Sequence, residues 1–316
     1  MRELIIGKND AGQRLDKFLT KALRLPTGLL YKAIRTKKIK RNRKRCEGGD
    51  LLAEGDRLQC FLPEDCFPGG AGSPLPRNLP KPDVLYEDEN ILLVNKRPGL
   101  SVHEDEDAGN DNLIAYIQGY LCEKGEYDPT AEQSFAPALC NRIDRNTGGI
   151  VIAAKNAEAL RVMNEKIRNN EITKTYLCAA HGKMPRRADE LRGFLRKDSA
   201  TNTVTVSDTP IAGGKTIITR YRVLAEKNGN SLLEVELVTG RTHQIRAHLA
   251  HIGHPLLGDG KYGENKDERG RGYKHQALYA ARLRFDFANG EGPLGYLAGK
   301  EFSIDENEVW FLKDFQ

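Results

Sequence analysis

The first part of the chain carries two short apolar faces at helical spacing. One face runs over residues 15–23 and the other over 29–34, with the helix-breaking Pro26-Thr27-Gly28 between them. A glycine-containing turn and the strand-like stretch DRLQCFL follow. These patterns predict two helices and a small sheet within residues 1–62.

Residues 63–82 lack any hydrophobic period. They hold six of the fourteen prolines of the chain and three glycines, a composition typical of a linker. A flexible coil of this length spans about 22 to 27 Å, and the prolines extend it further. We therefore expect the N-terminal unit to contact one part of a large partner while the remainder of the protein acts on another.

From Asp83 onward the pattern alternates between strands, helices and polar turns. Strand candidates are VLYEDENILLVNK, GIVIAA, TKTYLCAA, TIITRYRVLAE, SLLEVELV and ALYAARLRFDF. Asn156 begins a helix with an apolar stripe over 159–167, and a second helix is expected from Thr242 to Gly253. Since strands dominate and helices occur irregularly, we expect an α+β fold over 83–316, with a mixed, largely antiparallel sheet and flanking helices.

Positive charge is concentrated in the N-terminal unit. The chain has a net charge of +5, but residues 1–62 hold 16 Lys and Arg against 7 Asp and Glu, a net +9. The stretch 32–45 has nine basic residues and no acidic one, which indicates either a solvated surface or one that faces a polyanion such as RNA. The candidate RNA-binding residues are Lys32, Arg35, Lys37, Lys38, Lys40, Arg41 and Arg43.

The cysteines and the apolar runs indicate the cellular compartment of the protein. Six cysteines include no CxxC pair, so we expect reduced thiols rather than disulfides or a zinc knuckle. The N-terminus lacks the apolar run of a signal peptide, and no segment approaches the roughly 18 apolar residues of a membrane span. We expect a cytoplasmic protein.

Two clusters carry candidate chemistry. Asp144 lies in a polar turn between Arg142 and Arg145, before the apolar GIVIAA; it is either an ionised carboxylate at the rim of a cleft or an ordinary turn residue that caps backbone amides. The second cluster, TGRTHQIRAHLAHIGHP, places Arg241 in the turn before a helix. Its four histidines could be metal ligands, but without HExxH spacing or an obvious carboxylate ligand we favour structural or RNA-facing roles and expect no metal.

Four stretches together resemble a known family. ENILLVNKRPGLSVH, NRIDRNTGGIVIAAK, ITKTYLCAAHGK and LVTGRTHQIRAHLAHIGHPLLGDGKYG, in this order over residues 83–286, are similar to the motifs of the RluA family of RNA pseudouridine synthases. Residues 12–62 resemble the S4 RNA-binding domain, which precedes the catalytic domain in several members. The chain departs from the common pattern at Asn141, where many relatives have His, and at Gly148, where Ser is frequent. The tail after Phe287 matches nothing in the resemblance.

The resemblance implies a pseudouridine synthase fold, an enzyme and a set of roles. Asp144 corresponds to the catalytic aspartate, acting as a nucleophile at C1′, as a base toward a glycal, or by attack at C6 of the base. Tyr176 corresponds to the tyrosine that stacks on uracil, although a core tyrosine on a strand would fit the pattern too. The resemblance further implies that Arg241 pairs with the aspartate and that Arg142 fills the RNA stack after the target uridine flips out.

The same resemblance sets expectations for partners. We expect no cofactor, a monomer, and RNA as the partner, with ribosomal RNA favoured over transfer RNA because S4-bearing relatives often act there. The alternative is an RNA-binding or ribosome-assembly protein whose catalytic fold has lost activity. Because a degenerate enzyme need not keep Asp144, Tyr176 and Arg241 together, the enzyme is favoured.

Overall fold

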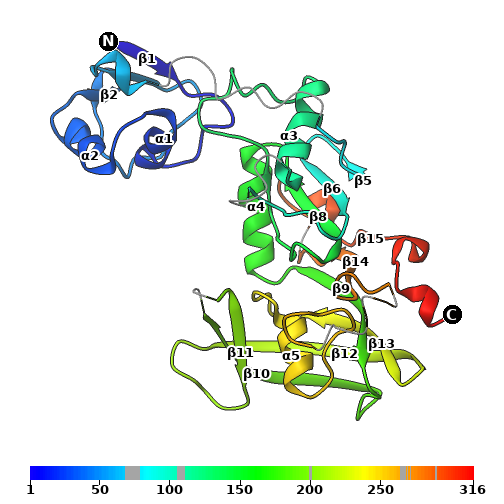
Figure 1. Ribbon diagram of the computed structural model, residues 1–316. Coiled ribbons are helices and arrows are strands. Elements are labelled where there is room, and N and C mark those ends of the chain that lie inside the picture. The colour runs from blue at the N-terminus through cyan, green and yellow to red at the C-terminus, as the bar shows by residue number, and fades with distance from the viewer. Residues whose placement is uncertain are drawn as a thin grey trace.

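The structure, a computed structural model, describes residues 1–67, 79–104, 111–198, 201–263, 268, 270, 272–288 and 290–316 (Figure 1). The α-helices in these residues are α1 Leu15–Ala22, α2 Thr27–Arg35, α3 Leu113–Glu123, α4 Ala157–Arg168 and α5 Gln244–His251. The strands are β1 Arg2–Ile5, β2 Ile39–Arg41, β3 Lys44–Arg45, β4 Arg57–Cys60, β5 Val84–Glu87, β6 Ile91–Lys96, β7 Ala138–Leu139, β8 Gly148–Ala154, β9 Ile172–His181, β10 Ala188–Asp198, β11 Thr203–Ser207, β12 Lys215–Lys227, β13 Asn230–Leu237, β14 Leu278–Phe285 and β15 Glu301–Ser303. Short 3-10 helices are η1 Glu64–Cys66, η3 Gly295–Leu297, η4 Glu306–Glu308 and η5 Leu312–Asp314.

The N-terminal unit contains the two predicted helices and a four-stranded sheet in the order β1-β4-β2-β3. Its core is built from the apolar faces of α1 and α2, including the fully buried Leu15, Phe18 and Leu19. The packing continues beyond the predicted boundary at residue 62, because Phe67 is buried in the same core and the Arg24 amide donates to the Cys66 carbonyl at 2.8 Å. The unit therefore extends to Phe67. Of the predicted linker 63–82, residues 68–78 lie outside the described residues.

Hydrogen bonds join the N-terminal unit to the rest of the chain. Its partners are the segment 132–134, which precedes β7, and the start of α4. The hydrogen bonds are Asn9 to Glu132 (2.7 Å), Gln13 to Ser134 (2.9 Å), Gln133 to the Ile5 carbonyl (2.6 Å), Ser134 to Asp10 (2.5 Å) and Arg161 to the Ala11 carbonyl (3.0 Å). These bonds join the two units directly, in addition to the chain connection through the predicted linker.

The second unit is built on an eleven-stranded sheet in the order β11-β10-β12-β13-β9-β14-β8-β6-β5, with β15 beside β14 and β7 beside β8. Only the pairing of β14 with β8 is parallel among the described strands. The predicted mixed, largely antiparallel sheet is therefore confirmed. The prediction from the apolar stripe over 159–167 is also confirmed, since α4 begins after Asn156, whose side chain accepts from the Ala159 amide at 2.8 Å.

Two adjacent glycines allow the close approach of β8 and β14. Gly149 has a φ of 111°, and a Cβ there would lie 2.2 Å from the Ala280 carbonyl oxygen. At Gly148 a Cβ would lie 2.3 Å from the Tyr279 ring, which occupies the space that a side chain would need. Serine is frequent at this position in the resembling family, whereas this chain has Gly148, over which the Tyr279 ring packs.

Helices cover both faces of the sheet. The core on one face includes α3 and the inward side of α5, whereas α4 packs into the core on the other face. The tail after Phe287, for which the sequence suggested no role, contributes Leu294, Leu297, Phe311 and Leu312 to the α4 side and completes that core. All six cysteines are free thiols, as predicted. In the described part of the chain no helix has the length and apolar character needed to cross a bilayer.

Candidate active site

Asp144 lies in the turn that connects β7 to β8, at the wall of a cleft of about 1160 Å³. The turn is closed by a hydrogen bond from the Thr147 amide to the Asp144 carbonyl at 3.0 Å. Lys96, at the end of β6, fixes the same segment, because its fully buried ammonium donates to the carbonyls of Arg145 (2.8 Å), Leu100 (2.8 Å) and Arg97 (3.1 Å). Burial lowers the pKa of Lys96 to about 7, against the attraction of Asp144.

The carboxylate of Asp144 is paired with Arg246, not with Arg241. An Arg246 Nη donates to Asp144 Oδ2 at 2.8 Å. Arg246 is itself held by Asp259 through bonds of 2.7 and 2.9 Å, and Asp259 is fully buried. This two-point contact raises the pKa of Arg246 although burial opposes its charge. Asp259 thus orients the arginine that holds Asp144.

The predicted pairing of Arg241 with Asp144 is wrong in this structure. Arg241 is exposed at the cleft wall, and its backbone amide donates to the Gln244 side chain at 3.1 Å. Arg246 occupies the inward side of α5, between the buried Ile245 and Leu249. Because α5 begins only at Gln244, Arg241 lies before the helix, and its side chain is not directed by the buried helix face.

In the described part of the chain, protein groups approach one oxygen of the Asp144 carboxylate. Arg246 at 2.8 Å and His243 at 3.9 Å both approach Oδ2. Among the described residues, no hydrogen bond or ion pair reaches Oδ1, and no backbone amide donates to the carboxylate. The interpretation of Asp144 as a turn residue that caps amides is therefore not supported. One anchored oxygen and one open oxygen suit a carboxylate that reacts with a bound molecule.

Tyr176 lies at the centre of β9, between β13 and β14, and lines the same cleft as Asp144. It is buried, with 6% of its surface exposed. Burial and the nearby charge of Asp144 raise the pKa of the phenol, so it stays protonated at neutral pH. Tyr176 is therefore a core residue on a strand, and it also has a protonated hydroxyl near the carboxylate. A core position and a role in the active site are compatible for this residue.

The cleft is strongly positive. Its lining includes eight Lys and Arg side chains and two acidic ones. The cationic residues are Arg142, Arg145, Arg168, Lys174, Lys197, Arg241, Arg246 and Lys261, and the acids are Glu104 and Asp144. Arg142, two residues before Asp144, is exposed at this wall. Such a lining favours a polyanionic ligand.

The four histidines of the second cluster have separate partners. His243 contacts Tyr262 (2.8 Å), His248 contacts Thr219 (2.9 Å), His251 contacts Asp208 (2.9 Å) and His254 contacts the His181 carbonyl (2.8 Å). Within the described ranges no group of three or more His, Cys, Asp or Glu side chains is arranged to hold a metal ion. These histidines therefore act through hydrogen bonds with protein groups.

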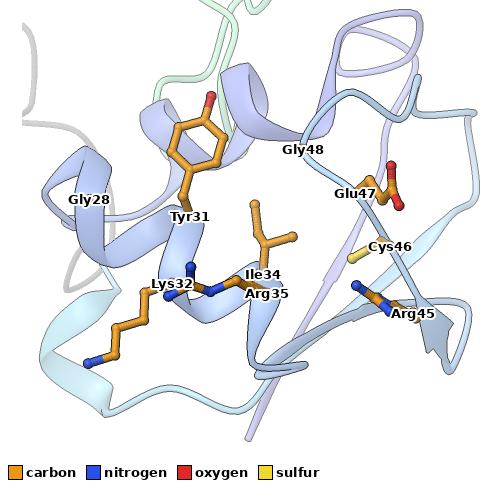
Figure 2. Close-up of a pocket in the computed structure, with 9 residues that line it drawn as sticks. All are labelled: Gly28, Tyr31, Lys32, Ile34, Arg35, Arg45, Cys46, Glu47 and Gly48. Atoms are coloured by element: carbon orange, nitrogen blue, oxygen red, sulfur yellow. The ribbon is translucent and has the colours of Figure 1, made fainter.

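The predicted basic residues of the N-terminal unit lie on α2, in the turn after it and on the β2–β3 hairpin. Lys32, Arg35, Lys37, Lys38 and Arg43 are exposed, whereas Lys40 and Arg41 are half-buried. Arg41 forms an ion pair with the buried Asp56 at 2.6 Å and is less available to a ligand than predicted. Lys32 and Arg35 line a pocket of about 370 Å³ with Arg45 and Tyr31, whose hydroxyl donates to Asp16 at 2.8 Å (Figure 2). Arg45 and Tyr31 were absent from the predicted set.

Arg246, Asp259 and Tyr262 were also missed by the sequence interpretation. A signal for Arg246 existed, because in QIRAHLAH the arginine directly follows Ile245 and stands three residues before Leu249, two apolar residues at helical spacing. A charge in such a place requires a buried partner. No comparable signal marks Asp259, which lies in a glycine-rich turn whose burial only the fold reveals.

Comparisons with known proteins identify the family and the fold. Residues 90–251 match the family model described as RNA pseudouridylate synthase. The ribosomal large subunit pseudouridine synthase C of Escherichia coli (strain K12) is 31% identical over 294 residues, covering 89% of this chain and 87% of that protein. The uncharacterized RNA pseudouridine synthase YhcT of Bacillus subtilis (strain 168) is 30% identical over 290 residues, covering 89% and 88%. The solved structure of human RNA pseudouridylate synthase domain containing 4 shares the fold, with a TM-score of 0.54 and 20% identity over 71% of this chain and 88% of that one.

Proposed function

Because this chain belongs to the family of RNA pseudouridine synthases, we propose that it converts specific uridines to pseudouridine in ribosomal RNA, with Asp144 as the catalytic carboxylate. The main support for this proposal is the pattern of contacts made by the two oxygens of the Asp144 carboxylate. Its Oδ2 is anchored by Arg246 at the wall of a positive cleft, and no described residue forms a hydrogen bond or ion pair with its Oδ1. The relatives named for the ribosomal large subunit support ribosomal RNA as the substrate.

The isomerisation breaks the bond between N1 of uracil and C1′ of the ribose and forms a bond between C5 and C1′. The proton on C5 leaves and N1 gains one, so the reaction consumes no redox equivalent. Each candidate route needs an ionised carboxylate with a free oxygen, which Oδ1 provides. Tyr176 is placed to stack on the uracil and to assist the proton movement at C5 with its protonated hydroxyl.

We propose that the RNA is held by two surfaces. Cations of the cleft bind the phosphates next to the target nucleotide, and Arg142 fills the stack from which the uridine has been extruded, a step that costs a few kcal/mol. The exposed basic residues of α2 and the β2–β3 hairpin bind a second segment of the RNA. This role agrees with the resemblance of the unit to an S4 domain. Since the two units are in contact, the distance between the bound segments is set by the protein.

The test uses the full-length protein and ribosomal RNA that carries tritium at uridine C5. Release of tritium measures cleavage of the C5–H bond, and carbodiimide mapping then locates the pseudouridine. We expect release with the native protein and with Asp305→Asn, an exposed carboxylate outside the cleft, but none with Asp144→Asn. RNA binding that persists in the native protein without tritium release on any ribosomal or transfer RNA would support the non-catalytic alternative.

A further inference from the structure

The contacts of His243 differ from those of a solvent-facing histidine. Its backbone is left-handed, with a φ of 52°, and it immediately precedes α5. Its side chain is 9% exposed and lines the cleft. Nδ1 lies 2.8 Å from the Tyr262 hydroxyl, and Nε2 lies 3.9 Å from Asp144 Oδ2, the oxygen that Arg246 anchors. The strained backbone thus brings the imidazole between Tyr262 and the reactive carboxylate.

The partners of Tyr262 determine which nitrogen of His243 carries the proton. The Val204 amide donates to the Tyr262 oxygen at 3.0 Å. The phenol proton has one acceptor within reach among the described residues, and that acceptor is Nδ1 of His243. Burial raises the pKa of Tyr262, so its hydroxyl keeps this proton. Nδ1 therefore accepts a hydrogen bond, and in the neutral ring Nε2 carries the N–H and directs it toward Asp144.

We infer that His243 is a positioning residue for Asp144: a neutral imidazole, fixed by Tyr262 as the Nε2–H tautomer, that presents an N–H dipole to Oδ2. This inference rests on the proposed function, since it assigns a second support to the proposed catalytic carboxylate. Arg246 and His243 approach the same oxygen and leave Oδ1 free. At 3.9 Å the contact is longer than a hydrogen bond, and the N–H dipole acts on Oδ2 electrostatically across this distance.

The surroundings of His243 favour the neutral ring. Burial lowers its pKa, and the charges of Arg246 and Lys261 act in the same direction, against Asp144 and Asp259. These groups come from each element around the ring: the turn before β8, helix α5, and the turn 259–262. The Tyr262 ring also packs against the Arg246 guanidinium, whose carbon lies 5.2 Å from the ring centroid. Removing only the Tyr262 hydroxyl leaves that packing in place.

The first experiment measures the tautomer directly. Nitrogen NMR of the imidazoles in the full-length protein, with His243→Asn to assign the signals, should show His243 protonated at Nε2 in the native protein and a mixture of tautomers in Tyr262→Phe. This readout does not depend on activity. A native His243 protonated at Nδ1, or a tautomer unchanged in Tyr262→Phe, would overturn the inference even if the enzyme is active as proposed.

The second experiment measures single-turnover rates against pH. Tyr262→Phe should lower the rate about twofold at pH 8 without changing RNA affinity, because a mixture of tautomers leaves roughly half of the molecules with an N–H at Nε2. The rate should recover toward pH 6, because the protonated imidazole again has an N–H at Nε2. Tyr120→Phe removes a tyrosine hydroxyl bonded to Glu87 outside the cleft and should match the native profile. A Tyr262→Phe rate reduced equally at every pH would contradict the tautomer argument.

Two substitutions at position 243 separate the side chain from the backbone. Asparagine tolerates the left-handed conformation but its amide does not reach the position of Nε2, whereas glutamine places an N–H there. We expect His243→Gln to retain more activity than His243→Asn when both are folded by circular dichroism. The reverse order would show that residue 243 matters only for its backbone.

Discussion

The arginine of α5 offers the most direct test of the site. Arg246→Met keeps an unbranched apolar side chain on the inward face of the helix and removes the charge shared by Asp144 and Asp259. The matched control is Arg241→Met, which removes an exposed guanidinium at the wall of the same cleft. The two variants make the same replacement, but the residue with hydrogen bonds to Asp144 and Asp259 is Arg246.

The expected magnitudes follow from burial. Breaking a buried ion pair typically costs about 3 to 5 kcal/mol, because the remaining charge is left without compensation. Asp259 is fully buried but keeps two backbone donors, Lys261 at 2.9 Å and Tyr262 at 3.2 Å, so we expect a loss near the lower end, about 3 kcal/mol. Adding Asp259→Asn to Arg246→Met removes the buried charge and should recover part of that stability without restoring catalysis. Urea unfolding measures both effects.

The assay for the chemical role is the single-turnover rate at saturating RNA. Without Arg246, Asp144 loses the guanidinium that holds its Oδ2 at 2.8 Å, so the carboxylate is no longer fixed at the cleft wall and the rate should fall about tenfold or more, the effect of a donor to a charged group. Arg246→Lys should fall between, since an ammonium cannot bridge both carboxylates as a guanidinium does. Arg241→Met should weaken RNA binding and leave this rate unchanged. A rate that falls in Arg241→Met but not in Arg246→Met would refute the assignment.

Four further results are expected. Asp144→Asn should bind RNA like the native protein and retain less than about 1% of its turnover, because it removes the carboxylate and no phosphate-facing charge; filter binding and tritium release measure the two. Lys96→Met should destabilise the fold by about 3 kcal/mol in urea, since the carbonyls around it lose a shared buried donor. Burial lowers the pKa of His248 to about 4, so the unfolded chain binds a proton at a higher pH than the folded protein does. The free energy of unfolding should therefore fall by about 3 kcal/mol from pH 6.5 to pH 4. His248→Gln should flatten this pH dependence in thermal melts. Deleting residues 1–67 should reduce the dependence of RNA affinity on salt, by about 0.7 to 0.9 in the log–log slope for each phosphate that this unit neutralises in the native protein.

Central strands of the large sheet were predictable because a strand that is buried on both faces has a continuous run of apolar residues. GIVIAA is apolar throughout, and all seven residues of β8 are buried between helices on both sides. The hairpin strand β10 was not predicted, because the half-exposed sequence ADELRGFLRKD has an apolar residue only at intervals and many charges. Edge and hairpin strands are stabilised by pairing with neighbours far along the chain, which leaves a weak local pattern.

The pairing of Asp144 with Arg246 depends on the left-handed conformation of His243, which the amino-acid sequence does not reveal. His243 is the only residue from Arg241 to His251 with a positive φ, and it separates the turn from the helix. If the helix had continued back through Arg241, that residue would lie one turn before Ile245 on the buried face. The left-handed residue ends this continuity, so the helix presents Arg246 to Asp144 and leaves Arg241 to the cleft wall. The partners of Asp144 come from segments about a hundred residues away, as the separation of 102 positions between Asp144 and Arg246 shows, and only the fold distinguishes two arginines that fit the sequence pattern equally well.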